Sequence, residues 1–260
     1  MKYLAIIQAR CGSFRLPGKV LKELCGKTDL EWVIERVKKS RYVDEVIVAT
    51  SMNEEDVPIV KLVSSLGLRV FAGSPDDVLD RYYQAAKLIK PEYVIRITAD
   101  CPVIDAGILD DAISKMTPQT DYTAALSETL ADGLDIEIMK YAVLERAWKE
   151  ARLASEREHV TLYIKNNPDK FHVLDYTCTF ANLHDERWTL DEPQDYEFLK
   201  TVYEYFISIG KTDFDAKDIC HYLDGHPEIR KINAGIIRNE GLLKSLKEDY
   251  TVDTGLEVRP

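Results

Sequence analysis

Short apolar runs alternate with segments of helical periodicity along the first hundred residues. The runs are LAIIQA (4–9), EVIVAT (45–50), LRVFAG (68–73) and YVIRITA (93–99). Apolar runs of this length that alternate with amphipathic segments are typical of βαβ units. A sheet built from such units is mainly parallel and carries helices on both faces. The pattern therefore predicts an α/β fold.

Three local signals predict where helices begin. Thr28 and Glu31 have the spacing of a capping box, and an apolar stripe at helical spacing follows them. The segment SPDD at 74–77 offers a serine cap, a proline at the first helical position and acids in the first turn. The segment SERE at 155–158 repeats the capping-box spacing and predicts a third helix start.

The pattern changes after about residue 120. Strand candidates at 121–126, 134–139 and 171–176 flank an expected helix near 141–165, and the chain from 195 to 247 is mostly of helical type. We expect one domain over residues 1–260. In it, a mixed, mainly parallel sheet carries a protruding segment at about 127–180, and helices at 195–250 close the fold.

Composition narrows the functional classes. The chain has 260 residues, of which 45% are apolar and 30% charged, as in ordinary globular proteins. Its net charge of −11 provides no basic face for nucleic acid. Five dispersed cysteines predict neither disulfides nor a cysteine zinc site. Without a signal peptide or an 18-residue apolar span, a cytoplasmic protein with no membrane partner is expected.

The stretch ARCGSFRLPGKV, directly after the first apolar run, has the composition of a phosphate-binding loop. It fails the Walker pattern, because five residues separate Gly12 from Gly18, Pro17 has no amide to donate, and Val20 replaces the hydroxyl that holds magnesium. In open α/β sheets, ligands bind at the carboxyl ends of the strands. The loop therefore predicts a site for a triphosphate, and an exposed basic turn is the alternative.

Two acids follow strand-like runs elsewhere. Asp100 ends YVIRITAD, and Asp191 ends RWTLD. Magnesium bound to a nucleotide takes one or two carboxylates and leaves its other positions to phosphate and water. Asp100 and Asp191 therefore predict one shared magnesium site, although an aspartate before a proline turn also occurs for turn geometry alone. Asp195 reads as a capping or first-turn acid of the following helix.

The sequence leaves the roles of two further polar residues open. His159 begins a helix-like segment and is more often structural than a catalytic base. Glu137 shares a strand face with Asp135, and that face could contact substrate or water. The sequence contains no GxSxG, GxGxxG or HExxH motif.

The order of the motifs QARxGSxRLPGKVL, ITADCP, DGLDxE, REHVT and LDxPxD resembles the cytidylyltransferase superfamily of CMP-3-deoxy-manno-octulosonate and CMP-acylneuraminate synthetases. The resemblance is strongest to the spore coat polysaccharide biosynthesis branch and covers essentially the whole chain. The chain departs from the family pattern at three positions: Phe14 stands where the family usually has a small or polar residue, Thr28 where it has a proline, and Glu192 where it has a threonine. The resemblance implies a nucleotide-diphosphosugar-transferase-like fold, transfer of CMP from CTP to an acidic sugar, Mg²⁺ dependence and a homodimer.

The resemblance also implies roles for individual residues. Lys19, Arg15 and Asp100 would be catalytic, and Asp100 and Asp191 would bind the metal. The nucleotide-binding set would be Arg10, Gly12, Ser13, Arg15, Lys19, Ser74 and Arg81. A glycosyltransferase that uses a nucleotide sugar and a non-catalytic sugar-nucleotide binding protein are the alternatives. A glycosyltransferase would normally have an Asp-x-Asp where this chain has Asp100-Cys101-Pro102.

Overall fold

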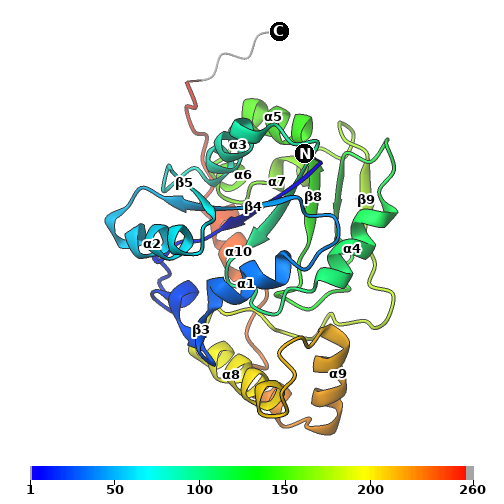
Figure 1. Ribbon diagram of the computed structural model, residues 1–260. Coiled ribbons are helices and arrows are strands. Elements are labelled where there is room, and N and C mark those ends of the chain that lie inside the picture. The colour runs from blue at the N-terminus through cyan, green and yellow to red at the C-terminus, as the bar shows by residue number, and fades with distance from the viewer. Residues whose placement is uncertain (1, 256–260) are drawn as a thin grey trace.

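The computed structural model describes residues 2–255, which fold around one central sheet (Figure 1). Its strand order is β5-β4-β1-β6-β8-β7-β9, and β8 alone in it runs antiparallel to its neighbours. The strands are β1 (Tyr3–Gln8), β4 (Glu45–Ser51), β5 (Arg69–Gly73), β6 (Tyr93–Thr98), β7 (Tyr122–Ala124), β8 (Glu137–Lys140) and β9 (Val173–Asp175). A small hairpin, β2 (Glu23–Leu24) and β3 (Lys27–Thr28), precedes the first helix.

Helices cover both faces of the sheet. One face carries α3 (Val78–Ile89), α5 (Tyr141–Glu150), α6 (Ala154–Glu158) and α7 (Leu162–Asn166). The other carries α1 (Asp29–Val37), α2 (Val57–Ser65), α4 (Ala106–Lys115), α8 (Pro193–Ser208) and α9 (Ala216–Gly225). Three short 3₁₀ helices, η1 (Lys19–Leu21), η2 (Glu54–Asp56) and η3 (Ile229–Lys231), lie in connections, and α10 (Glu240–Lys247) follows near the end. Within residues 2–255, no helix has the length and apolar character needed to cross a membrane.

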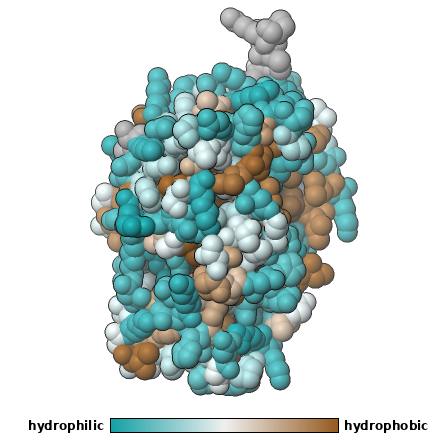
Figure 2. Space-filling view, turned by 90° about the vertical axis from the view of Figure 1, so that its right-hand side faces the viewer, coloured by the Kyte–Doolittle hydropathy of each residue, from teal (hydrophilic) through white to brown (hydrophobic). Residues whose placement is uncertain are grey.

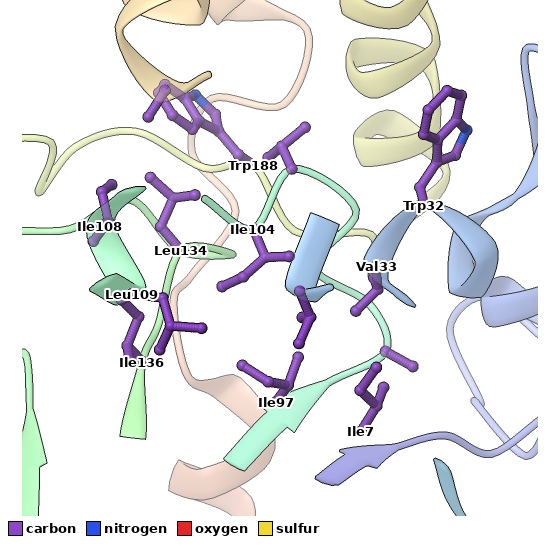
Figure 3. Packing of buried hydrophobic residues seen from close by; sticks show 14 of the residues in the cluster. Ile7, Trp32, Val33, Ile97, Ile104, Ile108, Leu109, Leu134, Ile136 and Trp188 are labelled. Carbon is purple, nitrogen blue, oxygen red and sulfur yellow. The ribbon is translucent and has the colours of Figure 1, made fainter. Parts of the chain in front are cut away.

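Alternating side chains of the central strands fill two cores. Ile6 and Val94 face α3, whereas Ile7 and Ile97 point to the opposite face. Around Ile7 and Ile97, Figure 3 shows side chains from α1, from α4 and from the extended chain at Trp188. Because both faces of each central strand are buried, these strands read as continuous apolar runs.

The predictions for the first hundred residues are confirmed for the strands and for one of two helix starts. The four apolar runs form β1, β4, β5 and β6, each within one or two residues of the predicted bounds. Thr28 caps α1, with Glu31 bonded back to it. The Ser74 cap is wrong, because Asp77 accepts the amide of Asp80 and α3 begins at Val78. The Ser74 hydroxyl instead accepts the amides of Asp76 and Asp77 in a turn.

Three predictions for the second half need correction. The expected helix near 141–165 is divided into α5, α6 and α7. Ser155 lies inside α6, whose start at Leu153 is bonded to the Glu156 carboxylate, so Ser155 is not a cap. The run ending at Asp191 is extended but forms only an isolated bridge at Arg187, because no neighbouring strand runs alongside it.

The segment predicted to protrude, 127–180, contributes β8 and β9 to the sheet and α5 to α7 to one face. Strand β9 ends the sheet and pairs with β7 on one side. Figure 2 views the molecule from this edge, where apolar side chains gather mainly in the upper half. A dimer formed through this segment stays a prediction.

The capping box of α1 supports a stability prediction. The Thr28 hydroxyl accepts the Glu31 amide at 3.3 Å, and the Glu31 carboxylate accepts the Thr28 amide at 2.7 Å. Thr28→Ala is expected to lower the free energy of unfolding by about 1 kcal/mol, measured by urea denaturation. Thr201→Ala removes a hydroxyl from the middle of α8 and is the control, with an expected change below about 0.5 kcal/mol. Equal losses in both variants would contradict the cap.

Candidate active site

The loop after β1 is closed on itself by hydrogen bonds. The Gly18 amide donates to the Cys11 carbonyl at 2.9 Å, and Gly18 has a φ of 68°, which a side chain would disfavour. The Ser13 hydroxyl accepts the Leu16 amide at 3.3 Å, so Ser13 braces the loop from inside. The Cys11 amide donates to the buried Asp56 carboxylate at 2.6 Å and ties the loop to η2.

Lys19 lies at the centre of the site. It is only 9% exposed, and its Nζ donates to Asp100 Oδ2 at 2.5 Å and to Asp191 Oδ1 at 2.7 Å. Burial by itself would raise the pKa of Asp100, but the charge and hydrogen bond of Lys19 lower it to about 2. The structure therefore brings together three predicted residues that lie far apart in the sequence.

Arg15 lies beside them and faces three carboxylates. Its guanidinium bonds to Asp191, to Glu192 through Nε at 3.0 Å, and to Glu240 through Nη1 at 2.5 Å. In the sequence, Glu192 stands out only as a departure from the family pattern, next to Asp191, and no signal indicated a role for Glu240. Arg15 and Lys19 thus present two cations at the carboxyl ends of β1 and β6. Strand β1 lies between β4 and β6, so this is where the strand order reverses and where ligands bind in open sheets.

Asp191 reaches the site through backbone contacts with the turn after β6. The Leu190 amide and the Thr189 hydroxyl donate to the Asp100 carbonyl at 2.8 and 3.1 Å. Gly133 permits this approach: it has a φ of 106°, and a Cβ there would lie 2.6 Å from the Thr189 nitrogen. Any side chain at Gly133 would force the backbone of the run that carries Asp191 to shift.

Asp195 fixes the other side of Asp191. Its carboxylate accepts the amides of Asp191 at 3.0 Å and Glu192 at 2.9 Å, at the start of α8. It also accepts two hydrogen bonds from the Arg187 guanidinium and one from the side-chain amide of Asn233. Its predicted capping role is confirmed, and the cap also orients Asp191.

A small cavity of about 120 Å³ opens beside the loop, at the carboxyl ends of β1, β4 and β5. Its lining is Arg10, Gly12, Ser51, Asn53, Glu55, Asp56, Pro75 and Asp76. Arg10 and Gly12, predicted to bind nucleotide, thus lie on its wall, whereas Ser74 stands one residue before it. A larger cavity, about 480 Å³, lies at the opposite end of the sheet around Tyr3, Tyr93 and Tyr141, away from Lys19.

Buried polar atoms without hydrogen-bond partners lie on the sheet face covered by α3. Within residues 2–255, Gln8 Oε1, Arg81 Nε and Nη1, and Arg96 Nε have none. Arg81 is 2% exposed, and Gly73 lies against it so closely that a Cβ would come within 2.8 Å of its side chain. Such atoms are costly unless a ligand or water satisfies them. Arg81 was predicted to bind nucleotide; Gln8 was not, because it reads as the end of an apolar run.

Asp29, at the first position of α1, is a further residue that sequence analysis missed. It is fully buried, and neither carboxylate oxygen has a partner within the described part of the chain. Burial raises its pKa well above the usual range, the charge of Asp100 adds to this, and Lys19 opposes it. In the sequence, Asp29 is indistinguishable from an ordinary first-turn acid, so no local signal indicated its burial.

The carboxylates of Asp100 and Asp191 fit a divalent cation. One oxygen from each already lies within 2.7 Å of a single positively charged atom, Lys19 Nζ. Magnesium is bound in proteins by one or two carboxylates together with substrate phosphates. No group of three or more acids, histidines or cysteines suited to a metal occurs within residues 2–255. The remaining ligands would therefore have to come from phosphate and water.

A second polar cluster lies around Glu137. This residue is 4% exposed and accepts bonds from Arg96, Tyr122, Thr161 and Lys165, so its side chain does not lie on an exposed strand face. His159 Nε2 lies 3.1 Å from the Ser245 hydroxyl, and burial lowers the pKa of His159.

Comparisons with known proteins agree with the fold. A sequence model of the family described as cytidylyltransferase matches residues 4–215. A protein of Methanocaldococcus jannaschii, MJ1063, is 39% identical over 239 residues, 91% of this chain and 96% of its own. The spore coat polysaccharide biosynthesis protein SpsF of Bacillus subtilis is 34% identical over 239 residues, covering 86% and 95%.

The 3-deoxy-manno-octulosonate cytidylyltransferase of Geobacter metallireducens is 29% identical over 170 residues, covering 65% of this chain and 62% of its own. A solved cytidylyltransferase structure from Leptospira borgpetersenii superposes with a TM-score of 0.84 at 33% identity, covering 92% of this chain and all of that one. The fold prediction is thereby confirmed. The protein is a member of the cytidylyltransferase family.

Proposed function

We propose that the protein transfers CMP from CTP to an acidic sugar and releases pyrophosphate, in the synthesis of a surface polysaccharide or another glycan. The observation that carries this proposal is the convergence of Asp100 and Asp191 on Lys19, next to Arg15. The match to the cytidylyltransferase family supports the nucleotide. The names of the Geobacter and Bacillus relatives support the acceptor class and the pathway.

In the proposed reaction, an acceptor oxygen attacks the α-phosphorus of CTP in line. A new oxygen–phosphorus bond forms, the bond to the β-phosphate breaks, and pyrophosphate leaves with its electron pair while the acceptor proton passes to water. Arg15 and Lys19 bind the phosphates and stabilise the charge that develops on them. Asp100 and Asp191 would hold Mg²⁺, which when bound neutralises phosphate charge.

The unpartnered atoms of Gln8 and Arg81 support a nucleotide base as the remaining part of the ligand. Gln8 offers an acceptor, and Arg81 offers two donors, all in a buried environment. A pyrimidine base carries donors and acceptors on one edge and could satisfy groups of both kinds. The charge of Arg81 costs free energy as long as its Nε and Nη1 stay unpaired, so binding would relieve that cost.

The test is to incubate the purified protein with Mg²⁺, each nucleoside triphosphate in turn and a panel of ulosonic and nonulosonic acids, and to measure pyrophosphate. Release is expected with CTP and an acidic sugar. Asp100→Asn is expected to lower the rate at least about a hundredfold, since one charged contact to the metal–phosphate complex is lost.

Asp213→Asn is the matched control. It makes the same chemical change at a surface carboxylate whose side chain is 82% exposed and pairs with Lys39. Its rate is expected to equal that of the unmodified protein. Turnover of a nucleotide sugar, with no pyrophosphate from any triphosphate and acceptor, would show a glycosyltransferase instead. Nucleotide binding without turnover of any kind would show a binding protein.

A further inference from the structure

Residues 238–251, here named the strap, run across the candidate active site. The strap starts where Arg238 donates to the Leu130 carbonyl and to Asp135, both at 2.9 Å. It continues through α10 and ends beside α6, where Thr251 forms a bridge with Leu153. In Figure 1 the chain rises from α9 at the bottom to the strap, which passes through α10 near the centre and continues toward the C-terminus at the top. The family match ends at residue 215, so the strap lies beyond it.

The first end of the strap contacts the phosphate loop. Glu240, the first residue of α10, accepts a bond from Arg15 Nη1 at 2.5 Å. Arg15 also pairs with Asp191 and Glu192, so three carboxylates surround one guanidinium. A guanidinium that pairs with carboxylate groups binds phosphate groups with the same geometry. Glu240 therefore occupies a position that a bound phosphate would contest.

The second end contacts the turn between α6 and α7. The Ser245 hydroxyl donates to Glu158 at 2.7 Å and lies 3.1 Å from His159 Nε2. Asp249 accepts the amide of Ser155 at 3.0 Å and its hydroxyl at 2.6 Å. The strap thus links the phosphate loop to the helices on the α3 side of the sheet.

Little apolar surface holds the strap in place. None of the residues of α10 is buried, and the side chains of Leu243 and Leu246 are each 47% exposed. The contacts named above are polar: exposed ion pairs at Glu240 and Asp135, which contribute little stability individually, and half-buried hydrogen bonds at Ser245 and Asp249. Segments with few buried contacts open at low free-energy cost while the rest of the protein stays folded.

We propose that the strap closes over the phosphate loop when no nucleotide is bound, and that a triphosphate opens it by displacing Glu240 from Arg15. The proposal rests on the proposed function for the identity of the ligand. Because strap closure and triphosphate binding compete for Arg15, each weakens the other by the same factor. A variant that cannot close the strap through this ion pair should therefore bind the triphosphate more tightly.

The first test measures CTP binding calorimetrically, with Mg²⁺ and without acceptor, in the full-length protein and in Glu240→Gln. The variant keeps the size of the side chain and removes its charge, so the affinity for CTP is expected to rise about three- to fivefold, the range of a single surface ion pair. Glu248→Gln, at the exposed far end of α10, is the matched control with unchanged affinity expected. Equal affinity in the Glu240→Gln variant and the unmodified protein would overturn the proposal.

The second test measures amide hydrogen exchange over residues 239–251. Without nucleotide, exchange is expected to be faster in Glu240→Gln than in Glu248→Gln, and CTP is expected to raise it in the unmodified protein. Identical exchange in the two variants without nucleotide would overturn the strap proposal, even if CTP fails to bind. Failure of CTP to bind the unmodified protein, with faster exchange in Glu240→Gln, would instead contradict the proposed function alone.

Discussion

Replacing Lys19 by methionine is expected to lower kcat/KM for CTP-dependent pyrophosphate release about a thousandfold. The loss has two parts. The phosphates lose a buried cation, and loss of one such contact typically costs a hundred- to a thousandfold. In addition, Asp100 and Asp191 lose the charge that now lies between them at 2.5 and 2.7 Å. Without the Lys19 charge, the main influence that lowers the pKa of Asp100 is lost.

Lys39→Met is the control for this experiment. Lys39 is 45% exposed and pairs with Asp213 on the surface, so its loss should leave kcat/KM unchanged. Lys19→Arg keeps the charge with a different shape and is expected to recover part of the activity. Circular dichroism and the urea midpoint of Lys19→Met separate loss of folding from loss of function. A folded Lys19→Met variant within tenfold of the unmodified protein would rule out the role proposed for Lys19.

The elements of the first half were predictable because local signals determine them. Buried parallel strands read as apolar runs, and the capping box at Thr28 and Glu31 acts within one turn of helix. The start of α3 was not predictable, because Ser74 and Asp77 both suit a cap and the sequence gives no basis for choosing between them. The division of residues 141–165 into three helices depends on packing against α3 and the sheet, which has no local signature.

The candidate site was predictable as a set of residues, but the position of Asp191 within it was not. Arg15, Lys19 and Asp100 follow strands whose carboxyl ends meet at one edge, so the fold pattern by itself predicts that they approach one another. Asp191 belongs to a chain segment without a strand partner. Its position depends on the Asp100 carbonyl, on Gly133 and on Asp195, and these contacts become visible only in three dimensions. The roles of these residues as metal and phosphate ligands stay predictions.

The residues missed by sequence analysis were missed for two reasons: burial of a polar group, and pairing with a residue that is distant in the chain. Asp29 and Gln8 are polar side chains with buried, unpartnered oxygens, and nothing in the neighbouring sequence distinguishes them from exposed residues. Glu240 is 225 residues away from Arg15 in the chain. The pairing of an exposed helix start with a phosphate loop depends on the course of the last helices, for which apolar periodicity gives no information.

Glu137 is the residue for which the largest effect on stability is expected. Its Oε1 accepts bonds from Tyr122 at 2.6 Å, Thr161 at 2.6 Å and Lys165 at 2.7 Å, and its other oxygen pairs with Arg96. Glu137→Leu leaves Arg96, whose side chain is only 17% exposed, without its partner. Breaking a buried ion pair in this way typically costs about 3–5 kcal/mol, and we expect a loss of that size in urea denaturation at pH 7.

The loss of stability in Glu137→Leu is expected to depend on pH. Burial by itself would raise the pKa of Glu137, but Arg96 and Lys165 lower it well below its usual range. A lowered pKa in the folded protein stabilises it above the unfolded-state value of about 4.3, and this contribution fades as the pH falls below that value. The difference between the unmodified protein and Glu137→Leu should therefore shrink by about 1 kcal/mol between pH 6 and pH 3.5.

Glu204→Leu is the matched control, since Glu204 is 59% exposed on α8 and its nearest cation, Lys200, lies at 3.9 Å. It should change the free energy of unfolding by less than about 0.5 kcal/mol at either pH. A loss below about 1 kcal/mol for Glu137→Leu at pH 7 would mean that Arg96 finds another partner or reaches water. A loss that stays constant between pH 6 and pH 3.5 would mean that the Glu137 carboxylate has an ordinary pKa in the folded protein.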